Sequence, residues 1–163
     1  MSGATRETLL ARLTEAGGTL PSAEATVYDY VIVKVHDRIA YLAGQIPKRD
    51  GGLTAVGRAG AEVSLDDAKA AARVCVEQAL AWIDSEAGGI ENVAEILRMD
   101  CYVAAAEDFT QISDIADAAS GLLIAVYGES GRHPRSVIGV SQLPRRVPVL
   151  LELTMALRNA PSR

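Results

Sequence analysis

The chain has 163 residues, of which 49% are hydrophobic and 23% are charged, and this composition excludes a disordered polypeptide. Only 4% of the residues are aromatic, so we expect a core of aliphatic side chains. The formal net charge of −5 disfavours general nucleic-acid binding, because an acidic surface repels phosphate groups.

The chain begins with a segment that is predicted to be helical. Leu9, Leu10 and Leu13 form an apolar stripe within residues 5–17, and a pair of glycines follows. This pattern indicates a short helix that ends at the glycines. Residues 1–22 are therefore expected to form an N-terminal helical extension of a single domain over the whole chain.

A hairpin is predicted next. Apolar and polar side chains alternate over residues 27–36, which indicates a strand. Asp37 and Arg38 are expected to turn the chain into a second strand over residues 39–45. The glycine-rich residues 47–60 are expected to form a loop.

The second half of the chain alternates helical and strand patterns. This order predicts an α+β fold, with the helices on one face of a mixed sheet. The predicted elements are a helix capped by Ser64 and Asp67, a strand over 94–103, a helix capped by Asp108, and strands over 136–140 and 147–157.

The chain shows no sign of a membrane or secreted protein. No apolar run reaches the roughly 18–20 residues of a membrane span. Residues 1–18 carry charges and no long apolar stretch, so no secretory signal is expected. Without such a signal, we interpret Cys75 and Cys101 as two buried thiols rather than a disulfide. The expected location is cytoplasmic.

One acidic residue lies within an otherwise uncharged segment. Glu152 is the only charge in residues 147–157, and a strand this apolar predicts burial. A buried carboxylate needs a partner or takes up a proton, so Glu152 either forms a structural ion pair or belongs to a site. Such an ion pair would lie in this domain or across a subunit contact.

Arg135 opens the apolar strand over residues 136–140 and is the natural partner of a carboxylate. An arginine can bind a carboxylate with two parallel hydrogen bonds. The carboxylate could belong to Glu152 or to a substrate. The alternative is a loop arginine in solvent.

Other polar residues give weaker signals. The hydroxyl of Tyr30 either orients a ligand or is the solvated tip of a packed ring. His36 and His133 lack the spacing of a metal site, so no metal is expected. No phosphate-binding loop or nucleophile motif is present, and no cofactor is predicted. Arg145 and Arg146 are interpreted as part of a solvated turn.

Five motifs together carry a family resemblance over residues 30–158. They are Tyr41-Leu42-Ala43-Gly44-Gln45-Ile46-Pro47, the alanine-rich helix from Asp67, Cys101-Tyr102-Val103 with Asp108-Phe109, Pro134-Arg135-Ser136, and Leu143-Pro144 leading to Glu152. The chain resembles the RidA (YjgF) family of reactive intermediate imine deaminases, also called L-PSP endoribonuclease-like proteins. It is most similar to a longer subgroup with an added N-terminal helix.

The resemblance implies a chorismate-mutase-like fold and a homotrimer with three clefts between subunits. The expected subunit has a mixed sheet, two main helices on one face and a short N-terminal helix. Members of the main branch hydrolyse 2-imino or 2-enamino acids to 2-keto acids and ammonia without a metal or cofactor. The expected ligand is therefore a small carboxylic acid, such as an imino or keto acid.

The resemblance also implies roles for individual residues. Arg135 pairs with the substrate carboxylate, and Glu152 helps to place or activate the water, so these two are the expected catalytic residues. Tyr30 lines the cleft, and the backbone of Gly44 lies beside it. Val137 is also expected to contact the substrate.

Two positions depart from the main branch. Val137 stands where a cysteine often follows the arginine by two places, and Ala43 stands where a serine commonly precedes the glycine. The leading expectation is an imine or enamine deaminase, and the alternative is a RidA-like protein that binds a small carboxylate without turning it over. An endoribonuclease is less favoured, because the net charge is −5 and aromatic residues are few.

Overall fold

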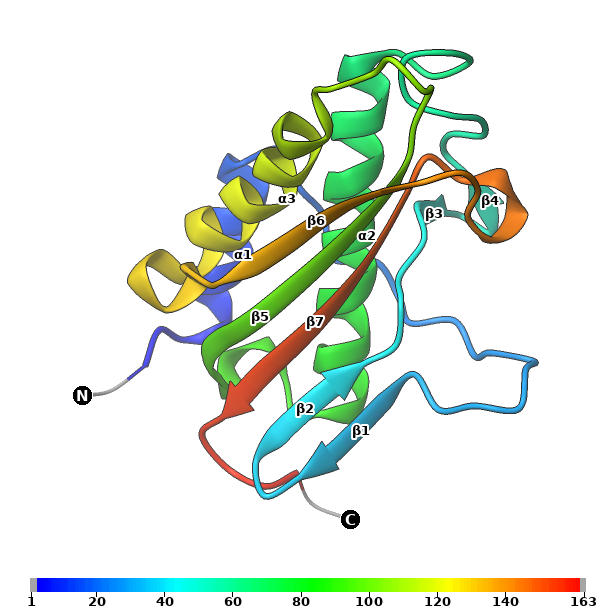
Figure 1. Cartoon of the computed structure of the whole chain (residues 1–163). Coiled ribbons are helices and arrows are strands. Elements are labelled where there is room, and N and C mark those ends of the chain that lie inside the picture. Colours follow the sequence, from blue (N-terminus) through cyan, green and yellow to red (C-terminus); the bar gives the residue numbers. More distant parts are fainter. Residues whose placement is uncertain (1–2, 162–163) are drawn as a thin grey trace.

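A five-stranded mixed sheet forms one layer of the protein, and the helices lie together against one of its faces (Figure 1). This computed structural model describes residues 3–161. The elements are α1 (Arg6–Glu15), β1 (Val33–His36), β2 (Ile39–Leu42), β3 (Lys48–Arg49), β4 (Gly52–Leu53), α2 (Leu65–Glu86), η1 (Ile90–Asn92), β5 (Val93–Ala104), α3 (Ile112–Tyr127), η2 (Gly128–Gly131), β6 (Arg135–Val140), η3 (Pro144–Arg146) and β7 (Val149–Leu157).

The predicted α+β fold is confirmed. The strand order in the sheet is β1-β2-β7-β5-β6, and only β5 and β6 run parallel. Parallel neighbours need a crossover connection, and α3 supplies it between β5 and β6. Helices α2 and α3 cover the inner face of the sheet, and the opposite face carries no helix (Figure 1).

The side chains of strand β7 divide between the covered face and the open face of the sheet. Its alternate residues from Val149 to Leu157 are buried under the helices, whereas Leu150, Glu152 and Thr154 point to the other face. The prediction that Glu152 is buried is therefore wrong. The segment is apolar because one face belongs to the core and the open face also carries apolar side chains such as Leu150.

Helix α2 begins as its sequence predicts. The hydroxyl of Ser64 accepts a hydrogen bond from the backbone N–H of Asp67 at 3.1 Å, which satisfies one of the free donors at the helix start. Alanines at positions 68, 71, 72 and 79 are buried on its inner face. Their small side chains allow the helix axis to lie close to the sheet.

The predicted N-terminal helix is confirmed as α1. Thr5 caps it by accepting a hydrogen bond from the N–H of Thr8 at 3.2 Å. Leu9 and Leu13 are 3% and 1% exposed and belong to the same hydrophobic cluster as the sheet. Helix α1 packs beside α3 (Figure 1), so the N-terminal segment completes the core rather than standing apart from it.

The hairpin forms, but its first strand is shorter than predicted. Asp37 and Arg38 have φ values of +47° and +63°, typical of a tight two-residue hairpin turn. Residues 27–32 are not a strand, and Val27 is 90% exposed. The alternation there has no partner, because β2 is only four residues long. Tyr30 therefore lies in a loop.

The structure also differs from the predicted boundaries around α3. Asp108 does not cap this helix, because the chain first turns at Phe109, whose N–H donates to Ala106 O at 3.0 Å. The helix begins at Ile112 and has no side-chain cap at Gln111. The glycine-rich loop contains the small hairpin of β3 and β4.

Cys75 and Cys101 are buried free thiols, as predicted. Burial raises the pKa of the Cys75 thiol well above its ordinary value. Of the helices within residues 3–161, none has the length and apolar character needed to cross a membrane.

The burial of Leu13 generates a stability prediction. Leu13→Ala leaves a cavity between α1 and the main core, and we expect it to lower the free energy of unfolding by about 2–5 kcal/mol. Thr14→Ala, at an exposed position on the same helix, is the matched control and should change it by less than about 1 kcal/mol. Urea unfolding at one protein concentration measures both. Equal small effects would show that α1 does not contribute to the core.

Candidate active site

A cavity of about 280 Å³ lies beside the loop that precedes β1. Tyr30 and Gly44 both line it, so the structure brings together two of the residues expected at a site. The ring of Tyr30 stacks on Tyr28 with a centroid distance of 6.2 Å and an interplanar angle of 13°. This stacking holds the exposed Tyr30 ring in the otherwise irregular loop.

Glu152 lies next to Gly44 across the sheet. Gln45 and Leu151 exchange two backbone hydrogen bonds of 2.8 and 3.1 Å, which places Gly44 opposite Glu152 in the antiparallel register. A Cβ atom at Gly44 would lie 2.6 Å from a methyl carbon of Leu150, so a larger residue here would require the Leu150 side chain to shift.

The surroundings of Glu152 leave its carboxylate available. It projects to the open face of the sheet, and its cross-strand neighbour is Asp100. The Asp100 carboxylate accepts hydrogen bonds of 2.9 and 2.7 Å from Arg98, which compensates its charge. Glu152 has no hydrogen bond or ion pair with any side chain of the chain as described. Its negative charge is the largest cause of the raised pKa of Tyr102.

Arg135 is held at the first position of β6, at the edge of the sheet. One of its terminal nitrogens (Nη1) donates to Ser120 Oγ at 3.0 Å, and the other (Nη2) lies 2.6 Å from Asp117 Oδ1. Its side chain is 23% exposed. Arg135 is therefore neither a loop arginine in solvent nor an arginine with both of its terminal nitrogens free.

Of the two carboxylates considered as partners of Arg135, Glu152 does not pair with it within the chain. Arg135 lies across from Met99, and Glu152 lies across from Asp100, the next residue along β5. Successive side chains on a strand point to opposite faces, so the two side chains lie on different faces of the sheet.

The expected site residues therefore form two separate groups. The first group, which we call the glutamate half-site, contains Gly44 and its two neighbours: Tyr30, which lines the same cavity, and Glu152, which is not among the residues that line this cavity and lies on the open face of β7. The second, the arginine half-site, contains Arg135 and Val137. Glu152 on β7 and Arg135 on β6 are separated by β5, so two strand spacings, about 10 Å, lie between their backbones. One chain does not bring the half-sites together.

A thiol lies beside the arginine half-site. Cys101 on β5 is the ladder neighbour of Val137 on β6. Burial raises the pKa of Cys101 to about 12, although the positive charge of Arg135 acts in the opposite direction. The thiol is therefore protonated at neutral pH and does not supply a nucleophilic thiolate near Val137.

Sequence reasoning missed several residues of both half-sites. Arg145 is exposed in the η3 turn, as predicted, and it also lines the Tyr30 cavity, with a φ of +56°. The positive φ had no glycine or asparagine to signal it. Asp117 and Ser120 were not recognised as partners of Arg135, because only the packing of α3 against β6 brings them together.

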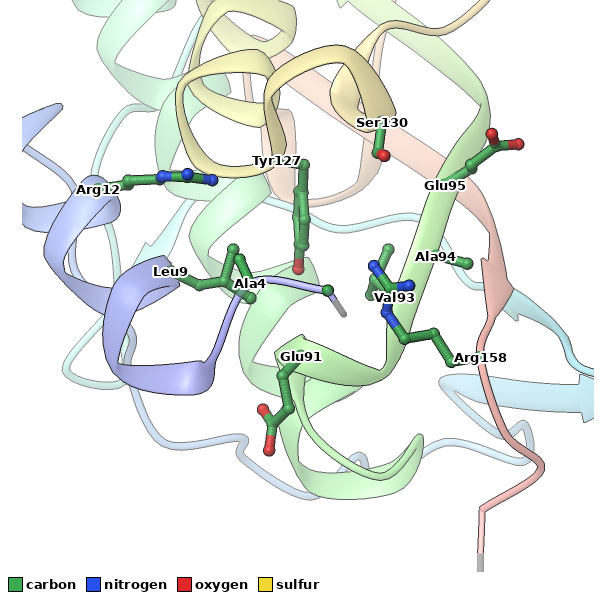
Figure 2. Close-up of a pocket in the computed structure, with 11 residues that line it drawn as sticks. Ala4, Leu9, Arg12, Glu91, Val93, Ala94, Glu95, Tyr127, Ser130 and Arg158 are labelled. Carbon is green, nitrogen blue, oxygen red and sulfur yellow. The ribbon is translucent and has the colours of Figure 1, made fainter. Parts of the chain in front are cut away.

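A second cavity, of about 510 Å³, lies near the N-terminal helix (Figure 2). Figure 2 shows the Tyr127 side chain directed into it from α3. Two arginines and two glutamates line it, so its walls carry no excess of either charge; they are Arg12, Arg158, Glu91 and Glu95. None of the expected site residues contributes to this cavity.

Comparison with known proteins decides the family. A model of the family described as YjgF/chorismate mutase-like, putative endoribonuclease matches residues 10–156. The chain belongs to this family. Membership in this family, also named RidA, agrees with the mixed sheet and the helix arrangement described above.

Similar proteins have almost the same length. The chain is 33% identical to a Trypanosoma cruzi protein named TCP17, over 91% of this chain and 94% of that protein. An Agrobacterium tumefaciens protein of unknown function has 27% identity and a TM-score of 0.88, over 93% of this chain and 94% of that one. A putative endoribonuclease from Shewanella oneidensis has 27% identity and a TM-score of 0.87, over 94% of this chain and 100% of that one.

The placement of Glu152 near Tyr102 can be tested by titration. Glu152→Gln removes the negative charge that opposes ionisation of the phenol, so we expect the raised pKa of Tyr102 to fall towards its ordinary value. Glu95→Gln, at an exposed position of the same strand, is the matched control and should leave it unchanged. An NMR titration of ¹³C-labelled tyrosine rings measures both. A Tyr102 midpoint unaffected by Glu152→Gln would contradict the placement.

Proposed function

We propose that this RidA-family protein hydrolyses 2-imino or 2-enamino acids to 2-keto acids and ammonia in a cleft between two subunits. The observation that carries the proposal is the division of the site residues into two half-sites. One offers an ordered guanidinium for a carboxylate, and the other offers, for a water, a carboxylate that no described side chain pairs with. The arginine half-site lacks a carboxylate to activate the water, and the glutamate half-site lacks a guanidinium to bind the substrate.

The chemistry requires only these two groups and a water. Arg135 binds the substrate carboxylate and so fixes the position of the adjacent C=N carbon. Glu152 accepts a proton from the water as its oxygen bonds to that carbon. The attacked imine is protonated, and its nitrogen takes the C=N electron pair. Glu152 then returns its proton to the nitrogen of the resulting carbinolamine, the C–N bond breaks and ammonia leaves, and the hydroxyl proton passes to solvent as the C=O bond forms. An enamine first takes a proton on carbon and reacts as the imine.

Asp117 has a defined part in this proposal. Its carboxylate is 66% exposed and lies 2.6 Å from the Nη2 atom of Arg135. The Asp117 side of this pair is in solvent and Arg135 is partly exposed, and such pairs contribute little stability, so a substrate carboxylate can replace Asp117 at this nitrogen at small cost. The contact of Nη1 with Ser120 remains in place during this exchange.

Association of three copies would join the half-sites. In a closed ring, each copy contacts the next through unlike surfaces. The β6 edge of one copy then lies beside the Tyr30 and Gly44 region of its neighbour, and three such contacts form three clefts. The open face of the sheet supports association, because Tyr41 and Ile138 are 51% and 45% exposed on it and would be covered.

Binding without turnover is the second candidate function. Val137 and Ala43 remove a thiol and a hydroxyl found in the main branch, and the neighbouring Cys101 thiol is protonated. The clefts of such a protein would retain a small carboxylate and leave it unchanged. Thermal stabilisation by 2-keto acids, with no keto acid formed from an imino acid, would favour this candidate.

The endoribonuclease named in the family description is a less favoured function. The chain has a net charge of −5, and the exposed Arg98 and Arg132 are each paired with an acidic residue. Cleavage of RNA that is lost in Glu152→Gln would favour this function over deamination.

Substitution of Arg135 tests the deaminase proposal. Arg135→Ala removes charged hydrogen bonds to the substrate, and we expect kcat/KM to fall by about 30- to 150-fold, equivalent to about 2–3 kcal/mol. Arg132→Ala, at an exposed arginine three residues earlier, is the matched control and should have little effect. The assay follows keto-acid formation from an imino acid generated by a dehydratase. If the wild-type protein forms keto acid no faster than buffer alone does, the proposal is overturned.

Mixing two inactive variants tests whether the half-sites come from different subunits. Arg135→Ala and Glu152→Gln chains each lack one half-site, but a mixed trimer contains clefts with both. If equal amounts are unfolded and refolded together, about one quarter of the wild-type activity should return. Chains refolded separately and then assayed together before exchange provide the control.

The same mixture gives an independent measure of assembly. Sedimentation should show a particle with the mass of three 17.2-kDa chains. A trimer that regains no activity on mixing would contradict a cleft shared between subunits.

A further inference from the structure

A chain of side-chain hydrogen bonds leads away from Arg135 into the protein. Arg135 Nη1 donates to Ser120 Oγ at 3.0 Å, and Ser120 Oγ lies 3.1 Å from His133 Nε2. The other ring nitrogen of the histidine, Nδ1, lies 2.6 Å from the carbonyl oxygen of Gly131. These groups come from β6, α3, η2 and the segment that follows η2.

The donors and acceptors allow only one direction of donation through this series of hydrogen bonds. The carbonyl of Gly131 only accepts, so His133 Nδ1 carries the proton and donates it. The Nε2 atom of a neutral ring then accepts a hydrogen bond from the Ser120 hydroxyl. The Ser120 oxygen is left to accept from Arg135, so each hydrogen bond supports the next.

The environment of His133 keeps the ring neutral at pH 7. Its pKa is lowered from the ordinary value, mainly because the ring is partly buried. The carbonyl of Gly131 opposes this effect, and the positive charge of Arg135 reinforces it. Arg132 and Glu129 lie close in the sequence but pair with each other at 3.0 Å.

We propose that Ser120 and His133 are positioning residues that orient the Arg135 guanidinium for a substrate carboxylate. The inference rests on the proposed function and extends it beyond the residues that touch substrate. Asp117 cannot supply this orientation alone, because substrate binding would displace it. Ser120 binds the other terminal nitrogen and stays in contact while Nη2 exchanges its partner. His133 in turn holds the Ser120 hydroxyl in the accepting orientation.

Paired substitutions separate this role from general packing. Ser120→Ala and His133→Ala remove links of the chain, whereas Ser120→Thr and His133→Gln keep a hydroxyl and an acceptor in their place. His36→Ala, at the other histidine of the chain, is the control because His36 is exposed at the hairpin. Thermal unfolding confirms that each variant is folded.

The direct readout is the NMR signal of the Arg135 guanidinium. An ordered guanidinium gives resolved Nη–H signals, and a freely rotating one does not. We expect the Arg135 Nη1–H signals, which report the contact with Ser120, in the wild type and in the Thr and Gln variants, and their loss in both alanine variants. Unchanged signals in Ser120→Ala would overturn the proposal.

The second readout is substrate affinity. In the alanine variants we expect KM for the imino acid and Kd for a 2-keto acid to rise about tenfold, with a smaller change in kcat. In the Thr and Gln variants we expect both constants to stay within about threefold of the wild-type values. A Thr variant as weak as the Ala variant would also overturn the proposal, because packing alone would then explain the loss. If the wild type neither binds nor turns over these acids, the proposed function fails, whereas the guanidinium signals still decide whether Ser120 and His133 order Arg135.

Discussion

The alternation of side chains along β5, β6 and β7 is the constraint on which the rest of the structure depends. It sends every second residue of β7 into the core under α2 and α3 and leaves Glu152 on a face that no helix covers. A register difference of one residue then places Arg135 on the opposite face from Glu152. The separation of the two half-sites is therefore a property of the sheet itself, and side-chain motion within one chain does not remove it.

The electrostatics of the two half-sites are complementary. On the open face, Arg98 compensates Asp100, and within residues 3–161 no cation pairs with the neighbouring Glu152. At the β6 edge, Arg135 is ordered by an interior hydroxyl and balanced by an exposed carboxylate that a ligand can replace. An unpaired carboxylate and an ordered guanidinium are the groups that hydrolysis of an imino acid needs. Their presence on different parts of the subunit explains why the proposed chemistry requires assembly.

The N-terminal helix α1 has a structural role beside the arginine half-site. Helix α1 adds Leu9 and Leu13 to the main core and packs against α3, whose residues Asp117 and Ser120 bind Arg135. The segment before β6 supplies His133, which is hydrogen-bonded to Ser120. The same helix that the N-terminal extension supports thus also holds the arginine half-site, although the nearby cavity of Figure 2 contains no residue of either half-site.

The α+β fold, the capped helix α2, the two-residue hairpin turn and the membership of Arg135, Glu152 and Gly44 in recognisable motifs could all be predicted from the sequence. These features depend on local periodicity, capping and turn chemistry, which a single segment carries. The sequence did not predict the exposure of Glu152, the loop position of Tyr30, the contacts of Arg135 with Asp117 and Ser120, or the division of the site residues into two groups. These outcomes depend on which strands become neighbours and on their register, and residues far apart in the chain settle both.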